Sequence, residues 1–258
     1  MIKNIITYQL KDLLRSKWIL FYGAFFYLIT EILLQFSGNE SKSVIGILNM
    51  CLILVPVISI IYGSIYVYNS REFIELMLTQ PIKRFSLYVG LYFGLAIPMA
   101  LMFVLGVGIP LVIFNPSMFF LYFYLLISGT LITFSYIGIA FLISFLLDDK
   151  AKGIGACFLF WMLTAIFYDG LIMFLIWKFE EYPLEVPIII SAILNPIDSA
   201  RVMVMLKLDI AALLGYTGAV FEKFFGTAMG LVISISSLLF YIITSFYLGL
   251  KVFLRKDF

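Results

Sequence analysis

The sequence predicts an all-α integral membrane protein with six transmembrane helices. Its 258 residues are 64% hydrophobic and 12% charged, with a mean hydropathy of +1.12. One soluble domain of this length could not bury so much apolar surface. The apolar residues also come in blocks of about 18 to 30, separated by short polar breaks, which is the pattern of transmembrane helices. A single transmembrane domain is therefore expected over residues 1–258.

Six blocks are long enough to cross roughly 30 Å of hydrocarbon at about 1.5 Å per residue. In chain order, they span residues of about 19–36, 44–68, 87–113, 118–147, 154–178 and 227–250. The first block is longer than the apolar part of a typical signal peptide, contains Glu31 and precedes no small-residue cleavage pattern. It is predicted to be retained as a span.

Lysine and arginine residues in the connections predict the orientation of the spans. Twelve lie in the amino-terminal segment, the second and fourth connections and the carboxy-terminal tail, whereas five lie in the other connections. Because positive charge collects on the cytoplasmic side, both termini are predicted to be cytoplasmic. Residues 179–226 are then the only long outer connection.

Residues 1–18 are predicted to form an interfacial helix. Isoleucines and leucines recur along one helical face, while Lys3, Lys11 and Arg15 occupy the other. Such a helix lies in the membrane interface with its basic side toward anionic headgroups, and Trp18 stands where the chain enters the membrane. Membrane lipid is therefore an expected partner.

Residues 69–86 are predicted to hold a short cytoplasmic helix between spans two and three. Ser70 can cap its amino end, and Pro81 prevents the helix from continuing past about residue 79. Phe73, Leu76 and Met77 form an apolar stripe. The stripe can rest on lipid headgroups or enter a groove on a partner protein, and physics alone leaves both open.

The run "ELMLTQPIKR", Glu75 to Arg84, resembles the segment after the second span of ABC-2 type permeases. In that family the segment is a coupling helix that docks on an ATP-binding subunit. The resemblance implies the fold of an ABC-2 (type V) exporter-like permease. It also implies ATPase-coupling roles for these residues: Ser70, Glu72, Glu75, Gln80, Pro81, Arg84, Asp148 and Asp149. The two aspartates lie in a connection that needs solvated charge in any case.

Several residue types needed for chemistry are missing from the sequence. It has no histidine and no phosphate-binding loop, and its two cysteines lie inside apolar blocks without a metal-ligand pattern. No catalytic, cofactor-binding or metal site is expected, and the chain is not expected to be an enzyme. ATP and Mg²⁺ would belong to a partner ATPase. The net charge of +2, spread along the chain, gives no reason to expect nucleic acid.

Asp169 is the one carboxylate expected deep within a span, the fifth. At that depth it costs about 2.5–3.5 kcal/mol on insertion scales, so it should face the bundle, a wet cavity or a donor, or be protonated. Two interpretations stay open. Asp169 is either a functional intramembrane residue or the cap of a re-entrant outer helix after a break near Gly170, as is common in ABC-2 exporters.

The stretch "NPIDSARV" predicts a helix start in the outer connection. Asn195 is a cap, Pro196 takes the first helical position, and Asp198 can pair with Arg201 three residues later. The helix is expected to reach about Leu214, where Gly215 supplies a stop before a second short helix leads into span six. This outer structure is either a lid on the bundle or a docking platform.

Residues 195–226 are similar to the outer segment of NosY-like permeases, which serve nitrous oxide reductase maturation. Together with the run "TQPIKR" and the six-span layout, this similarity covers nearly the whole chain. It implies a homodimer in the bacterial cytoplasmic (inner) membrane, two copies of a cytoplasmic ABC ATPase, and a periplasmic β-helical partner of the NosD type. Together they would support maturation of the copper–sulfur centre. The implied periplasmic platform comprises Asn195, Pro196, Asp198, Arg201, Gly215, Tyr216 and Gly218.

A homodimer is also expected because six helices are few for a gated pathway. Met203 and Met205 are two apart on a helix and so point in different directions, which argues against copper binding there. Two further functions stay open: an exporter of drug, lipid or polysaccharide with the same architecture, and a non-transporting membrane scaffold.

Overall fold

The computed structural model describes residues 7, 9, 10, 13, 16–36, 40–114, 119–179, 185–206 and 215–256. This part of the chain is helical, and no β-strand occurs in it. The predicted all-α class is thus confirmed. Most of the interfacial helix expected over residues 1–18 lies outside the described residues, although Gln9 and Leu13 are both buried.

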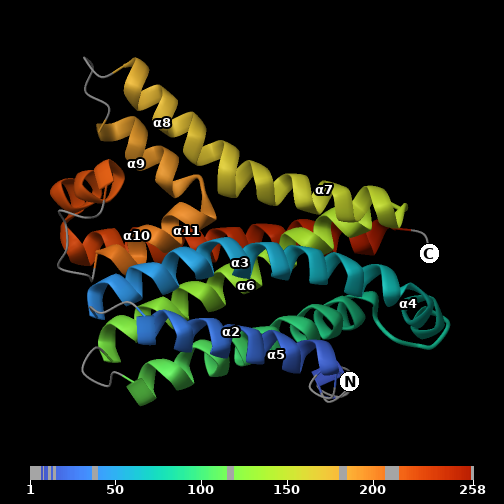
Figure 1. Cartoon of the computed structure of the whole chain (residues 1–258). Helices are drawn as coiled ribbons and strands as arrows, with labels where there is room; N and C mark the ends of the chain where they lie inside the picture. The colour runs from blue at the N-terminus through green and yellow to red at the C-terminus, as the bar shows by residue number, and fades with distance from the viewer. Residues whose placement is uncertain are drawn as a thin grey trace.

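Six helical stretches are long and apolar enough to cross a membrane, as predicted. They are α2 (Lys17–Phe36), α3 (Glu40–Asn69), α5 (Arg84–Phe114), α6 (Phe119–Leu146), the run α7–η2–α8 (Lys150–Lys178) and α11 (Gly215–Arg255). Figure 1 shows them side by side, with both chain ends and the short helix α4 (Arg71–Leu78) at one end of the bundle. That arrangement agrees with an even number of crossings.

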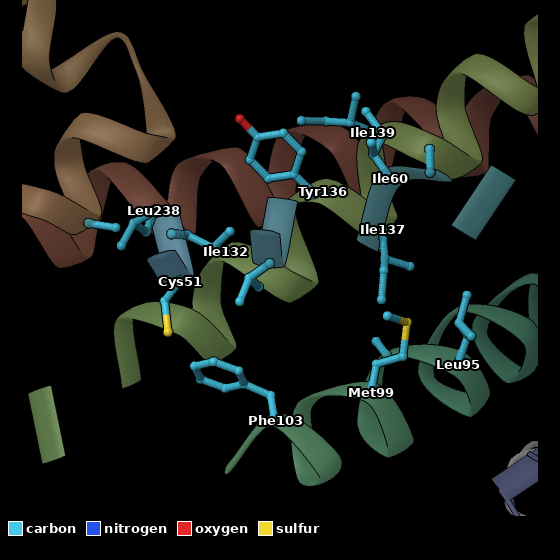
Figure 2. Close-up of a cluster of buried hydrophobic side chains, with 14 of the residues drawn as sticks. Cys51, Ile60, Leu95, Met99, Phe103, Ile132, Tyr136, Ile137, Ile139 and Leu238 are labelled. Carbon is cyan, nitrogen blue, oxygen red and sulfur yellow. The ribbon is translucent and has the colours of Figure 1, made fainter. Parts of the chain in front are cut away.

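Helix α6 is the centre of the bundle. It packs against α3, α5 and α11, and α2 covers the far side of α5. Buried side chains from these helices meet around Tyr136 and Ile137 of α6, with Met99 and Phe103 coming from α5 and Leu238 from α11 (Figure 2). The remaining run, α7–η2–α8, has no buried residue in its most apolar stretch and lies at the periphery.

The fifth span is continuous, which corrects the proposed break near Gly170. A π-helical segment, η2 (Leu163–Phe167), joins α7 (Lys150–Met162) to α8 (Tyr168–Lys178). The amide of Tyr168 bonds to the carbonyl of Leu163, five residues earlier, so the backbone ladder passes through the segment. Asp169 lies in the first turn of α8 without a helix break behind it.

The re-entrant element is instead the next helix pair, α9 (Glu185–Ile193) and α10 (Pro196–Met205). The two helices are bent by 105° at their junction. Asn195 is extended there, with φ −122° and ψ 119°, because the residue before a proline avoids the helical region. The sequence did not predict α9, whose nine residues are too few to cross a membrane.

Two other boundaries differ from the prediction. Helix α10 ends at Met205 rather than near Leu214, and residues 207–214 lie outside the described residues. Gly215 does not stop a helix but begins α11, which continues into the sixth span for 41 residues. The expected second short helix is therefore the amino-terminal part of α11.

Close packing of α2 on α5 depends on a glycine of α5, Gly106. A methyl group on Gly106 would lie 2.6 Å from the backbone oxygen of Gly23 and 3.1 Å from Cβ of Phe26. A backbone oxygen cannot rotate away, so the two helices would have to separate. Small residues are typical where membrane helices approach closely.

We expect Gly106→Ala to lower the thermal unfolding midpoint of the detergent-purified protein, with a cost of about 1–3 kcal/mol for overpacking. Gly155→Ala in α7 is the matched control, since no atom lies within 4 Å of the added methyl group. It should be neutral or stabilising by up to about 1 kcal/mol. Equal midpoints for the two variants would contradict the proposed close contact.

Candidate functional site

The turn between α9 and α10 places Asn195 inside the bundle, where it is 1% exposed. Its Oδ1 accepts a hydrogen bond from the amide of Ile197 at 3.1 Å, which is the cap that the sequence predicted. Its Nδ2 donates to the carbonyl of Thr164 at 2.9 Å and to Oδ2 of Asp198 at 3.0 Å. One amide thus joins the turn to the fifth span and to the first turn of α10.

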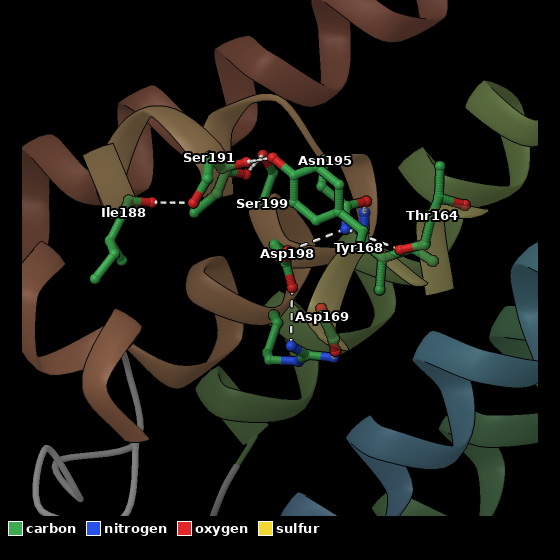
Figure 3. A network of polar contacts seen from close by, with 11 residues as sticks. Thr164, Tyr168, Asp169, Ile188, Ser191, Asn195, Asp198 and Ser199 are labelled. Atoms are coloured by element: carbon green, nitrogen blue, oxygen red, sulfur yellow. Dashed lines mark hydrogen bonds and ion pairs between the residues drawn. The ribbon is translucent and has the colours of Figure 1, made fainter. Parts of the chain in front are cut away.

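Arg201 lies between two carboxylates that are distant in the sequence. Its Nη1 is 2.8 Å from Oδ1 of Asp198, as the predicted spacing allows, and its Nη2 is 3.0 Å from Oδ2 of Asp169 in α8. The guanidinium fork suits such paired contacts. Figure 3 shows Asp198 and Asp169 converging on this group. The donor that a carboxylate in the fifth span requires is therefore Arg201.

The pair with Asp198 is more shielded from water than the pair with Asp169. The Asp198 side chain is 11% exposed, against 34% for Asp169 and 32% for Arg201. Shielded charges interact strongly but are costly to desolvate, so each needs its partner in place. The cluster carries two carboxylates for one guanidinium, and the amide of Asn195 supplies the additional donor.

Hydroxyl groups around the turn satisfy the last carbonyls of α9. A helix leaves its final four carbonyls without partners inside the helix. Here each accepts a side-chain hydroxyl: Ser191 from Tyr168, Ala192 from Ser199, Ile193 from Ser237 and Leu194 from Tyr241. The donors come from α8, α10 and α11, so the end of α9 is fixed by three other helices. Figure 3 shows part of this network.

Thr164 completes the polar cluster within η2. Its hydroxyl lies 2.8 Å from the hydroxyl of Tyr136 in α6, and its carbonyl accepts from Asn195. Sequence reasoning identified neither threonine nor tyrosine, nor the serines that bind α9. Nothing in their local sequence marks these residues as partners, because the groups that they bond lie in other helices.

The residues of the predicted outer platform fall into two groups. Asn195, Pro196 and Asp198 are buried, and Arg201 is engaged by two carboxylates, so these side chains do not form an open docking surface. They hold the hairpin formed by α9 and α10 in the bundle. This arrangement favours the interpretation as a lid over that as a docking platform. The backbone of Gly215, Tyr216 and Gly218 begins α11, and the Tyr216 side chain lies outside the described part of the structure.

A second polar group lies at the opposite end of the bundle, on and beside α4. The helix ends at Leu78, consistent with Pro81, but Ser70 makes no side-chain cap bond. The apolar stripe is not free as expected: Phe73 and Met77 pack against the core beside Ile74, which is fully buried.

The outer face of α4 is exposed. Leu76 is 67% exposed, and Glu72, Glu75, Gln80 and Pro81 surround it on this face and the following turn.

The other predicted coupling residues hold neighbouring helix ends together. Asp148 meets Nζ of Lys256 at 2.6 Å and Nη2 of Arg71 at 3.7 Å, and Asp149 caps α7 by accepting the amide of Lys152 at 2.8 Å. The hydrogen bond from Lys256 and its charge, with Arg71 beyond, lower the pKa of the Asp148 carboxyl.

Arg84, at the start of α5, donates to the carbonyls of Leu254 and Lys256 at 3.3 and 2.8 Å. The beginning of α5 is therefore bonded directly to the end of α11.

No site for a metal or a polar ligand emerges elsewhere in the described part of the chain. It contains no group of three His, Cys, Asp or Glu side chains placed to bind a metal. A cavity of about 230 Å³ opens between α2, α3 and α5, lined by Trp18, Phe21, Tyr22, Ile58 and Met99 among others. Its lining includes no residue of the cluster around Asn195 and Arg201 and none of the polar residues on and beside α4. We therefore assign no functional site to this cavity.

We expect Arg201→Gln to destabilise the protein by roughly 2 kcal/mol, less than the about 3–5 kcal/mol of a fully buried pair because Arg201 is one third exposed. Thermal unfolding in detergent measures the change. The double variant Arg201→Gln with Asp198→Asn should recover part of the loss, since the more shielded carboxylate is then removed while Asp169 still lacks its donor. A double variant no more stable than Arg201→Gln alone would contradict this.

Comparisons with protein-family models and with curated proteins found no match to this chain. The resemblance to ABC-2 type permeases accordingly rests on the quoted motifs and on the six-span layout read from the sequence.

Proposed function

We propose that the chain is the membrane-spanning permease subunit of an ABC transporter of the ABC-2 type. In this function a partner ATPase, which binds ATP and Mg²⁺, drives movement of the spans through α4. The observation that carries the proposal is the construction of α4, which is fixed to the bundle on one face and exposed on the other. A helix that transmits force from a separate protein needs one face fixed to the bundle and a second face that the other protein can contact.

The exposed face of α4 has the character of a protein contact. Leu76 is a large apolar side chain at 67% exposure, flanked by Glu72 and Glu75. An apolar centre with a polar rim is typical of protein interfaces. The run through Gln80 and Pro81 to Arg84 is the part that resembles the family motif.

The attachments of α4 reach several spans. Arg71 donates to the carbonyl of Leu147 after α6 at 3.2 Å, and Asp148 links this loop to Lys256 after α11. Arg84 joins the start of α5 to the same end of α11. A displacement of α4 therefore acts on α3, α5, α6 and α11 together, which is what coupling to an ATPase requires.

A second copy of the chain is the proposed partner within the membrane. The most apolar stretch of the fifth span buries none of its residues, while the corresponding stretch of α6 is 61% buried. Large apolar side chains such as Leu163, Phe167 and Trp177 are exposed along it. A two-fold contact through this helix would cover them and give a homodimer with two coupling helices, one for each ATPase.

The specific system that we propose is nitrous oxide reductase maturation in the bacterial cytoplasmic membrane. Support comes from the similarity of residues 195–226 to the outer segment of NosY-like permeases. The periplasmic β-helical partner of the NosD type would contact exposed parts of the outer end, rather than Asn195 and Asp198, which are buried at the turn of the hairpin. The work done would be transport or a mechanical action on that partner.

Affinity purification of the tagged chain from its own host should recover an ABC ATPase, identified by mass spectrometry. Leu76→Asp should abolish this recovery, because a charge at the centre of the apolar contact is desolvated without a partner. Lys251→Glu is the matched control, an exposed charge change on α11 near the same end, and should retain the ATPase. Recovery of no ATPase with the unaltered chain, or equal recovery with Leu76→Asp, would refute the coupling role.

A strain lacking the chain should make nitrous oxide reductase without its copper–sulfur centre. The purified reductase would contain less copper and lack the absorption of that centre, and the unaltered chain supplied in trans should restore both. Leu76→Asp should not restore them. Full copper content in the deletion strain would show that the permease handles a different cargo.

A further inference from the structure

The fifth span contains one residue more than an α-helix would need between its two ends. In η2 the amide of Tyr168 bonds five residues back to Leu163, instead of four. A π segment of this kind adds about one residue to the turn, so everything after it is rotated by about 100°. The direction in which Asp169 points is therefore set by η2.

Nothing in the local sequence requires the π geometry. The segment reads Leu-Thr-Ala-Ile-Phe, with no proline or glycine to disturb an α-helix. Such segments are rare and occur mostly as single turns inside α-helices. The extra residue must therefore be held by contacts from other helices.

Three contacts from other helices converge on η2 and the turn after it. Asn195 donates to the carbonyl of Thr164 at 2.9 Å, Tyr136 bonds to the hydroxyl of Thr164 at 2.8 Å, and Arg201 pairs with Asp169 at 3.0 Å. Two of the three come from α10 or the residue before it. The hairpin thus holds the fifth span in its present register.

We propose that the fifth span is a two-register helix, and that Asn195 is the positioning residue that keeps it in the π register. When the hairpin withdraws Asn195, η2 returns to α geometry and α8 turns by about 100° with a shift of about 1.5 Å. This inference rests on the fold alone. It therefore stands or fails independently of the proposed ATPase partner.

The change of register alters every contact of α8 at once. Without the extra residue, each side chain takes the place of the residue that follows it, so Tyr168 replaces Asp169 beside Arg201 and Phe167 replaces Tyr168 beside α9. Phenylalanine has no hydroxyl, so the 2.6 Å bond from Tyr168 to the carbonyl of Ser191 is lost together with the ion pair. Because the hydrogen bond and the ion pair are lost together, the helix has two discrete registers and no stable position between them.

Cysteine cross-linking distinguishes the registers. In a background with Cys51 and Cys157 replaced by Ala, the pair Tyr168→Cys with Ser191→Cys, joined by a bifunctional thiol reagent about as long as a tyrosine side chain, reports the π register. The pair Phe167→Cys with Ser191→Cys reports the α register, since Phe167 is now 58% exposed and would turn toward α9. The first pair should cross-link several-fold more than the second when Asn195 is intact.

Asn195→Ser tests the role of the amide. Serine still caps α10 but has no Nδ2 to donate to Thr164. We expect this variant to raise cross-linking of the Phe167→Cys pair several-fold and to lower that of the Tyr168→Cys pair. An unchanged preference for the Tyr168→Cys pair would overturn the proposal.

A deletion pair gives a second test that does not depend on how well the Asn195 variant folds. Deleting Ile166 removes the extra residue while Asp169 keeps its direction, so the protein should fold and hold the Tyr168→Cys cross-link even with Asn195→Ser. Deleting Leu159, similarly exposed but in regular α7, displaces Phe160 to Thr164 from their contacts even if η2 relaxes, so it should destabilise the protein more than deleting Ile166. If deletion of Ile166 is as damaging as deletion of Leu159, η2 holds no removable residue and the proposal is wrong.

Discussion

Backbone polar groups that lie away from water must be paired, and this constraint shapes the whole molecule. Helices meet it internally along their length, which is why the described chain is helical. The hairpin between α9 and α10 is the exception, since its turn lies among other helices. There the constraint is met by side chains: Asn195 caps α10, and four hydroxyls bind the last carbonyls of α9. In this very apolar chain, these polar side chains lie where backbone groups have no hydrogen-bond partner within their own helix.

The ion cluster belongs to the same solution. Arg201 and Asp198 lie on α10, and Asp169 lies on α8, so the charges fix the hairpin against the fifth span. Shielded ion pairs contribute little net stability but are costly to break, so they select one arrangement over its neighbours. At the opposite end, the contacts of Asp148 and Arg84 with the end of α11 select the position of α4 in a wetter environment. Charged residues therefore have different roles at the two ends of the bundle. Those at the hairpin fix how it packs on the fifth span, and those near α4 join the ends of neighbouring helices.

How much could be predicted from the sequence depended on whether the signal was local. The six long helices follow from apolar blocks, and the cap at Asn195 and the pairing of Asp198 with Arg201 follow from spacing. The burial of Asn195 and Asp198 does not, because turn residues and charges usually mark solvated connections. Helix α9 was missed because its nine residues are too few for a span. The segment η2 was missed because its register is imposed by residues about 30 positions away. Contacts between distant segments are what a single sequence leaves open.

The donors that bind the end of α9 also impose an order on biosynthesis. Tyr168 and Ser199 are made before or with the hairpin, but Ser237 and Tyr241 belong to the last helix. Until the ribosome has added that helix, the carbonyls of Ile193 and Leu194 lack these two donors. The hairpin can therefore reach its final depth only when the sixth span has been delivered beside it. A chain truncated after residue 206 would keep its first five spans but leave the hairpin without the donors of the sixth.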